Sequence, residues 1–307
     1  MSKNIIPVFF AIDNNYLPFL AVSLQSIKEN ASKQYIYKIH VLNTGVEKEK
    51  EDKILELQDD CFQISFVDVS KKLDEISKFI GLRDYYTCTT YFRLFIAGMF
   101  PEYDKALYLD ADTVVPGDLS ELYNTDLGNN LISAVLDETV LALDIFQDYV
   151  KNALGVPHEQ YFNAGVILMN LKLFREEDFY GKFNALLKTY KFSVAQDQDY
   201  LNVLCKDRVL YLGVEWNKMP MPPVIDKPKL IHYNLTRKPW HYDETLYSEI
   251  FWEYAKKTAF YQEILNVKKA FTKEDAQKDA LCEQNLVAMA KKEAEAKDNY
   301  YNLYVKK

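Results

Sequence analysis

Short runs of consecutive apolar residues alternate along this chain with longer segments in which apolar residues recur every three or four positions. The first run, residues 5–12, is apolar throughout, which is typical of a strand buried on both faces. Next comes a segment with apolar side chains at helical spacing, at Leu17, Leu20, Ala21, Leu24 and Ile27. The alternation continues, and it predicts further strands at residues 38–42, 64–69, 106–109, 131–136, 161–170, 209–212 and 230–233 and further helices at residues 47–57, 91–99, 178–190 and 196–205. We therefore predict an α/β fold with a mainly parallel sheet and helices on both faces.

The pattern changes in two places. Residues 137–160 show only weak periodicity, and we interpret them as a candidate lid over a site. Beyond residue 245 an aromatic-rich helix is expected at residues 246–260. Residues 272–304 are rich in Lys, Glu and Ala, which predicts a solvated helix. The chain is thus expected to form one domain, residues 1–245, followed by a C-terminal helical extension, residues 246–307.

Composition and charge restrict the possible partners. A net charge of −8 argues against nucleic acid, because that binding depends on neutralising phosphates with Lys and Arg. The four cysteines form no Cys-x-x-Cys pair, so we expect reduced thiols in a cytoplasmic protein. No apolar run reaches the ~18 residues that span a bilayer. The lysine pairs at 291–292 and 306–307 are nearly cancelled by neighbouring acids, so only weak peripheral attachment to the inner membrane face is expected.

Two aspartates, Asp110 and Asp112, follow the predicted strand 106–109 directly. The carboxyl edge of an α/β sheet is where ligands bind, and two carboxylates there suit a divalent cation that carries phosphates. Alone the motif is weak, because a strand-end turn also favours Asp. His232, at the end of a later predicted strand, could supply a third ligand, and a mixed oxygen and nitrogen set favours Mn²⁺ over Ca²⁺.

Four more features could serve a site, and each also has an ordinary explanation. Arg93 could hold a phosphate or sugar hydroxyl, or lie on the surface. Asp197 and Gln198 could contact a ligand, or the acidic residue could favour the start of the predicted helix. Lys238, in a loop after His232, could meet a diphosphate or form part of a solvated basic turn. Gly165, inside a predicted strand, indicates that something approaches the backbone closely there.

Six motifs, in the same order along the chain, resemble those of glycosyltransferase family 8. The motifs lie at residues 10–16, 90–93, 107–112, 161–165, 196–199 and 232–241. The family includes retaining galactosyl- and glucosyltransferases of bacterial lipo-oligosaccharide synthesis, and glycogenin. The resemblance covers about residues 5–245, and it implies a GT-A fold, a Rossmann-like nucleotide-sugar-binding domain.

The resemblance also implies a donor site, position by position. A UDP-sugar, UDP-galactose or UDP-glucose, would be held through Mn²⁺ or Mg²⁺, with Asp110, Asp112 and His232 as the metal ligands. Tyr16 would stack on uracil. The other expected contacts are Ala11, Asp13, Asn15 and Thr87 to the uridine, Ala111 beside the metal ligands, Arg93, Asn163, Ala164, Asp197 and Gln198 around the donor sugar, Lys238 to the diphosphate, and Asp137 to acceptor or sugar.

The resemblance implies retention of the anomeric configuration. A double displacement would need a carboxylate nucleophile, but the matching residue is the amide Gln198. We therefore expect front-face attack, with Gln198, Asp197 and Arg93 as the catalytic residues and a saccharide, glycolipid or glycoprotein as acceptor. One position departs from the family: Leu235 stands where a glycine would let the backbone approach phosphate.

Three alternatives remain open. Residues 109–113 also resemble the Asp-x-Asp-x-Thr motif of haloacid-dehalogenase-type phosphatases, although three predicted strands precede them. The chain could instead bind a UDP-sugar without turning it over. It could also place sugar on one of its own tail tyrosines, Tyr300, Tyr301 or Tyr304.

Overall fold

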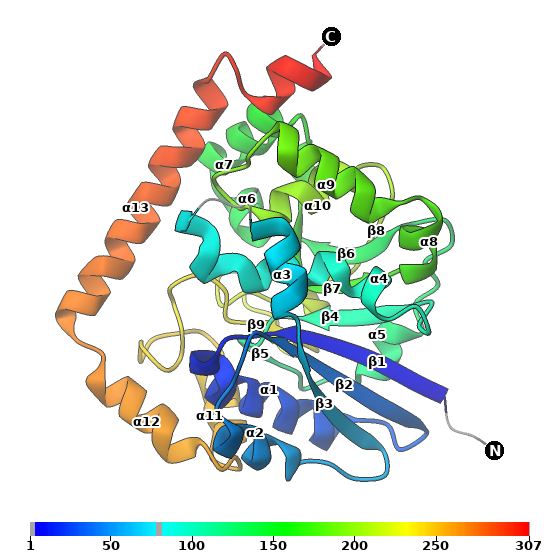
Figure 1. The fold of residues 1–307 in the computed structure, drawn as a ribbon. Helices are drawn as coiled ribbons and strands as arrows, with labels where there is room; N and C mark the ends of the chain where they lie inside the picture. The colour runs from blue at the N-terminus through cyan, green and yellow to red at the C-terminus, as the bar shows by residue number, and fades with distance from the viewer. Residues whose placement is uncertain (1–3, 78–81, 307) are drawn as a thin grey trace.

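A seven-stranded sheet forms the centre of the computed structural model (Figure 1), which describes residues 4–77 and 82–306 but not the side chains of residues 75–77 and 82–88. The strand order is β3-β2-β1-β4-β7-β6-β8. Strands β1, β2, β3 and β4 pair in parallel, as do β6 and β8, whereas β7 runs antiparallel to both of its neighbours. The predicted α/β fold with a mainly parallel sheet is confirmed. The bounds are β1 (Asn4–Ala11), β2 (Tyr35–Asn43), β3 (Phe62–Asp68), β4 (Ala106–Leu109), β6 (Ile132–Leu136), β7 (Phe162–Met169) and β8 (Val209–Tyr211).

Alternate residues of the central strands enter two different hydrophobic clusters, one on each face of the sheet. Phe9 and Tyr108 belong to one cluster, and Val8 and Leu107 belong to the other. This arrangement explains the continuous apolar runs, because both faces of these strands are buried. One face is covered by α1 (Leu17–Asn30), α11 (Ser248–Ala255) and α12 (Tyr261–Ala270), and the other by α4 (Ile96–Met99), α8 (Leu171–Glu176), α9 (Phe179–Thr189) and α10 (Asp197–Leu204) (Figure 1).

Two segments differ from the expected helical pattern. The predicted helix 91–99 is mostly the end of a 3-10 segment, η2 (Leu82–Phe95), with only α4 in α geometry. Residues 137–160, the candidate lid, form regular structure. They fold into α6 (Glu138–Ala142), α7 (Asp144–Tyr149), η3 (Val150–Leu154) and η4 (His158–Gln160). Phe146, Tyr149 and Val150 are buried in the core, so this segment is packed into the domain.

A second, two-stranded sheet lies beside the main one. It pairs β5 (Thr113–Val114) with β9 (Ile231–His232) in antiparallel register, with Thr113 opposite His232. The part before residue 245 also contains the smaller helices η1 (Asn14–Tyr16), α2 (Lys48–Leu55), α3 (Ser70–Ser77), α5 (Leu119–Tyr123) and η5 (Val214–Trp216).

The C-terminal segment contains α11, α12, α13 (Lys273–Glu295) and η6 (Tyr301–Val305). Helix α11 packs against α1, and its Phe251 and Ala255 are buried. Helix α13 runs along one side of the molecule (Figure 1) and packs near its C-terminal end against α7 and η3. Near its N-terminal end, Tyr242 donates a hydrogen bond of 2.8 Å to Asp279. The division at residue 245 stays a prediction. Among the helices in the described part of the chain, none is both long and apolar enough for a membrane span.

Candidate active site and metal centre

Two strand pairings bring the proposed metal ligands together. Asp110 and Asp112 follow β4 directly, and the backbone N–H of Asp110 donates to the carbonyl of Gly165 on β7, at 2.8 Å. The β5–β9 pairing sets His232 opposite Thr113, and the N–H of Tyr233 donates to the carbonyl of Asp112 at 2.9 Å. The sequence prediction that these three side chains meet is thereby matched in space: one ligand atom from each lies within 4.8 Å of the others.

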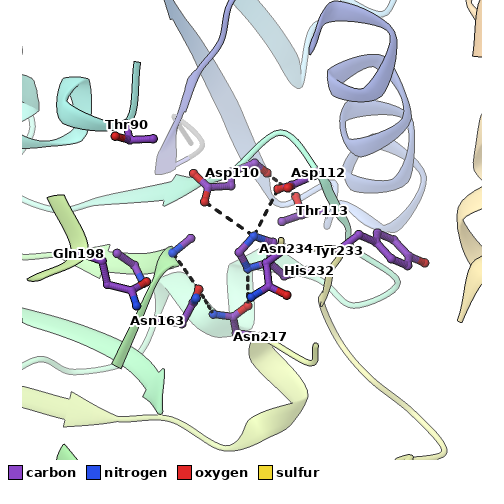
Figure 2. Close-up of polar contacts among 12 residues, drawn as sticks. Thr90, Asp110, Asp112, Thr113, Asn163, Gln198, Asn217, His232, Tyr233 and Asn234 are labelled. Atoms are coloured by element: carbon purple, nitrogen blue, oxygen red, sulfur yellow. Dashed lines mark hydrogen bonds and ion pairs between the residues drawn. The ribbon is translucent and has the colours of Figure 1, made fainter. Parts of the chain in front are cut away.

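Each of the three side chains has one polar atom engaged by the rest of the protein. A second polar atom of each is directed at the other two side chains (Figure 2). Asp110 Oδ1 accepts from Tyr108 Oη at 2.9 Å and from Arg93 Nη2 at 3.2 Å. His232 Nε2 lies 3.7 Å from Asp110 Oδ2 and 3.2 Å from Asp112 Oδ1. Asp112 Oδ1 is buried and makes no hydrogen bond within the described structure. These atoms fit a divalent cation, whose charge would offset the two carboxylates.

The outer oxygen of Asp112 is held by Lys238, which also donates to the carbonyl of Tyr233. Burial by itself would raise the pKa of Asp112, but Lys238 and His232 hold that pKa well below its usual range. The carboxylate is therefore ionised at physiological pH and suited to a metal. Burial also works against the charge of Lys238, yet Asp112 raises the pKa of the lysine.

The site leaves no room for a side chain at Gly165. A Cβ added at this position would lie 2.1 Å from His232 Cε1 and 2.7 Å from Asp110 Oδ2. The close approach predicted from a glycine within a strand is that of two proposed metal ligands. A side chain at position 165 would occupy the space between the strand and the site.

Arg93 joins the metal-binding side to the helix that begins at Asp197. It is 3% exposed, its Nε lies 3.0 Å from Asp197 Oδ2, and its guanidinium stacks over Tyr108, 4.3 Å from the ring centre. It also donates to the carbonyl of Ala164. Burial raises the pKa of Asp197 to about 6, although Arg93 acts in the opposite direction. Arg93 is thus a buried bridge between two acidic groups.

Hydrogen bonds made by the side-chain amides of Asn163 and Gln198 connect the predicted sugar-binding residues. Asn163 Nδ2 donates to Asp137 Oδ2 at 3.1 Å, and Gln198 Nε2 donates to the same oxygen at 3.1 Å. Gln198 Oε1 accepts from the backbone N–H of Ala164 at 2.9 Å. Asp137 also caps α6 by accepting from two backbone N–H groups. Four predicted residues therefore form one hydrogen-bonded group.

A pocket of about 340 Å³ opens in front of these groups. Its polar wall contains the two aspartates of the metal cluster, His232, Arg93, Asn163, Asp197 and Gln198. Its apolar wall comes from α6, α7 and η3, with Leu235 of the loop after β9 and Leu286 of α13. Helix α13 thus contributes to the site, which the sequence pattern did not indicate.

Three of the predicted uridine contacts, Asp13, Asn15 and Tyr16, follow β1, the strand next to β4. Asp13 Oδ1 accepts from the backbone N–H groups of Asn15 and Tyr16, at 2.8 and 3.3 Å. Asn15, Tyr16 and Lys238 line a second pocket, which shares Leu235 with the first. Ala11 ends β1 and is partly exposed, whereas Ala111 is buried in the core; the side chain of Thr87 lies outside the described structure. The roles of these residues stay predictions.

Leu235 adopts a left-handed backbone conformation, with φ of 56°, and its side chain is 51% exposed. Replacing it with glycine is expected to leave stability unchanged or raise it by up to about 1.5 kcal/mol. The left-handed conformation costs an L-residue about 1–2 kcal/mol, and the flexibility of glycine in the unfolded chain offsets roughly 0.5–1 kcal/mol of that gain. Leu235→Ala, which loses the leucine side chain beyond Cβ but keeps the strain, is the control. Urea unfolding should rank the glycine variant above the alanine variant; the reverse order would contradict the argument.

Sequence reasoning missed several side chains that hold the site together. Asn217 and Tyr108 contact the metal-binding residues, and Asp199 accepts hydrogen bonds from Tyr161 at 2.7 Å and Tyr149 at 2.8 Å. Burial raises the pKa of Asp199 to about 6. Asp199 belongs to the motif at residues 196–199, but nothing in that motif indicates that its partners are tyrosines.

Comparison with known proteins identifies the class of this site. The model of the family "Glycosyl transferase family 8" matches residues 7–244. This chain belongs to glycosyltransferase family 8, and the resemblance seen in the sequence is confirmed.

Three relatives illustrate the range of the family. A putative glycosyltransferase of Haemophilus influenzae is 30% identical over 247 residues, covering 76% of this chain and 72% of the relative. A lipopolysaccharide 1,3-galactosyltransferase of Salmonella typhimurium is 28% identical, covering 76% and 72%. A lipopolysaccharide 1,2-glucosyltransferase of Escherichia coli is 33% identical, covering 49% and 48%. Other relatives are longer: two streptococcal glycosyltransferases are matched over only 24% and 23% of their own length.

Solved structures agree with the fold. The bifunctional glycosyltransferase WbbM superposes with a TM-score of 0.78 at 28% identity, covering 88% of this chain and 53% of that one. The galactosyltransferase LgtC, in complex with donor and acceptor sugar analogs, gives 0.69 at 28% identity, covering 83% and 96%. The predicted GT-A fold is confirmed.

Proposed function

We propose that this protein is a retaining glycosyltransferase that moves a hexose, galactose or glucose, from a UDP-sugar to a saccharide, glycolipid or glycoprotein acceptor. The observation that carries the proposal is the cluster of Asp110, Asp112 and His232, whose inward atoms border a pocket lined by Arg93 and Gln198. The relatives that act on lipopolysaccharide transfer glucose or galactose, which supports a hexose donor.

Asp110, Asp112 and His232 would hold the cation, Mn²⁺ or Mg²⁺. A bound cation would offset the negative charge that develops on the UDP leaving group. Lys238 would add positive charge on the same side, because its ammonium group already lies against Asp112. Arg93 would keep Asp110 oriented through their 3.2 Å contact and would hold Asp197 toward the sugar.

Two features support front-face attack. Gln198, in the position where a double displacement would need a nucleophile, is an amide held by the N–H of Ala164 and by Asp137. The nearby carboxylate of Asp199 is fully buried and accepts hydrogen bonds from two tyrosines and from the N–H of Ala195. In the proposed reaction Gln198 faces the reacting carbon with its carbonyl, Asp197 binds sugar hydroxyls, and the departing diphosphate takes the proton of the acceptor.

The phosphatase interpretation of residues 109–113 is not favoured, because the chain belongs to a glycosyltransferase family. Binding without turnover and transfer of sugar to a tail tyrosine remain as competitors, and the first of them predicts nucleotide affinity without release of UDP. We propose a cytoplasmic location, with only weak attachment to the inner membrane face. Near the C-terminus, Leu303, Tyr304 and Val305 are exposed, which supports such an attachment.

The test is donor hydrolysis without any acceptor. UDP-galactose and UDP-glucose are incubated with the protein in Mn²⁺, Mg²⁺ or EDTA, and released UDP is measured. We expect slow release from one of the two donors, reduced at least ~100-fold in EDTA, because charge stabilisation of the leaving group is lost. UDP-N-acetylglucosamine, GDP-mannose and p-nitrophenyl phosphate serve as controls. Nucleotide binding without release from any donor would support the binding protein instead, and release of phosphate from the simple ester would support the phosphatase.

A further inference from the structure

Asn217 is a buried amide, 1% exposed, that lies between the proposed metal ligand His232 and the sugar-side residue Asn163 (Figure 2). It follows η5 directly, and no sequence motif marks it. Its side chain makes two contacts: Oδ1 lies 3.1 Å from His232 Nδ1, and Nδ2 donates to Asn163 Oδ1 at 2.9 Å.

The direction of these hydrogen bonds is determined by the backbone. Asn163 Oδ1 also accepts from the N–H of Gly165 at 2.9 Å, so the atom facing Asn217 must be an acceptor. Asn217 therefore presents its NH₂ group to Asn163 and its carbonyl oxygen to His232. That oxygen can only accept, so His232 carries a proton on Nδ1, and in the neutral ring that a cation requires, the lone pair is on Nε2. Nε2 faces the carboxylates of Asp110 and Asp112, and these three groups together would hold a cation.

The main chain keeps Asn217 in place independently of its side chain. The N–H of Lys218 donates to the carbonyl of Leu230 at 2.9 Å, and the N–H of His232 donates to the carbonyl of Lys218 at 3.0 Å. Lys218 is itself fully buried and pairs with Glu138 at 2.6 Å. A change confined to the amide of Asn217 should therefore alter the hydrogen bonds of the site without displacing the segment.

We infer that Asn217 is a positioning residue that couples the metal centre to the donor-sugar pocket. Through one face it fixes the tautomer and orientation of His232. Through the other it holds Asn163, which in turn binds Asp137, the partner of Gln198. This inference rests on the proposed function and deepens it: the cation and the sugar contacts share one hydrogen-bonded chain.

Two substitutions distinguish the contact of Asn217 with His232 from its contact with Asn163. Asn217→Ala removes both contacts, and we expect Mn²⁺ affinity to fall about 10–100-fold, as for the loss of other hydrogen-bond partners of metal-binding histidines. Asn217→Asp keeps an acceptor for His232 Nδ1–H, so Mn²⁺ affinity should stay within about threefold of the unaltered protein or increase. It cannot donate to Asn163, whose amide should turn, so KM for the UDP-sugar that the unaltered protein hydrolyses should rise.

Mn²⁺ binding is measured on the full chain without nucleotide, by calorimetry and by the electron paramagnetic resonance signal of free Mn²⁺. Asn184→Ala on α9, an amide outside this network, is the matched control and should bind Mn²⁺ normally. The inference is overturned if Asn217→Ala binds Mn²⁺ as tightly as the unaltered protein, or if Asn217→Asp binds it as weakly as Asn217→Ala. Either result leaves the proposed function standing, whereas an unaltered protein that binds no Mn²⁺ removes both.

Discussion

Replacing Asp112 with asparagine is expected to lower Mn²⁺ affinity by more than about 100-fold, the upper limit for losing an outer partner of a metal ligand. Metal-dependent release of UDP should disappear with it. The reason is the unpartnered Oδ1 of Asp112, which lies 3.2 Å from His232 Nε2 and has no other described hydrogen bond. An amide at this position lacks the negative charge that the cation would offset. Calorimetric Mn²⁺ titration and the UDP-release assay together measure the effect.

The same substitution also tests the role of Lys238. Without the carboxylate, the buried ammonium group of Lys238 has lost its anionic partner, and breaking a buried pair in this way costs about 3–5 kcal/mol. Adding Lys238→Met to Asp112→Asn should recover part of the stability in urea unfolding without recovering Mn²⁺ binding. If Asp112→Asn alone keeps normal metal-dependent activity, Asp112 is not a metal ligand and the proposed function fails.

Gly165→Ala should disable the site without removing any polar group. The added methyl would lie 2.1 Å from His232 Cε1 and 2.7 Å from Asp110 Oδ2, so at least one ligand must move. Overpacking of this kind typically costs about 1–3 kcal/mol. The displacement should reduce Mn²⁺ affinity as severely as the loss of a ligand, because the three donor atoms no longer converge. Urea unfolding and Mn²⁺ titration report the two effects separately.

Gly98→Ala provides the comparison for this prediction. A Cβ at Gly98 meets no heavy atom within 4 Å, and the residue lies in α4. Alanine there should be neutral or stabilise the protein by about 0.5–1 kcal/mol, because glycine is the less favourable residue within a helix. A Gly165→Ala protein with unchanged Mn²⁺ affinity would show that the site tolerates a methyl group, and that the glycine has another purpose.

The site residues at strand ends were predictable, because a residue at the end of a strand lies at the edge of the sheet. Asp110 and Asp112 follow a run too apolar for anything but a buried strand, and the same holds for His232. Gly165 could be interpreted for a related reason, because glycine has no side chain to pack in a buried strand and therefore indicates a close approach to the backbone. The antiparallel direction of β7 could not be predicted, because the weak periodicity of the preceding segment 137–160 does not indicate whether it contains a parallel crossover.

The hydrogen-bond partners of the site residues could not be predicted from the sequence. Asn217 has meaning only beside Asn163 and His232, and these three residues come from three separate segments. Asp199 shows the opposite case, since its motif was visible but pointed to a ligand rather than to Tyr149 and Tyr161. Apolar periodicity indicates which face of an element is buried, but it does not indicate which polar groups meet across the core.

The pairing of β5 with β9 also has a consequence for folding. Asp110 and Asp112 are separated in the chain from His232, and tertiary contacts such as this pairing unite them. An unfolded chain offers no such cluster, so a cation held there binds the native state alone. At 100 times its dissociation constant, such a ligand stabilises the native state by about 2.7 kcal/mol through mass action. The melting temperature in Mn²⁺ therefore reports how far the site is filled, and it does so without a donor or an acceptor sugar.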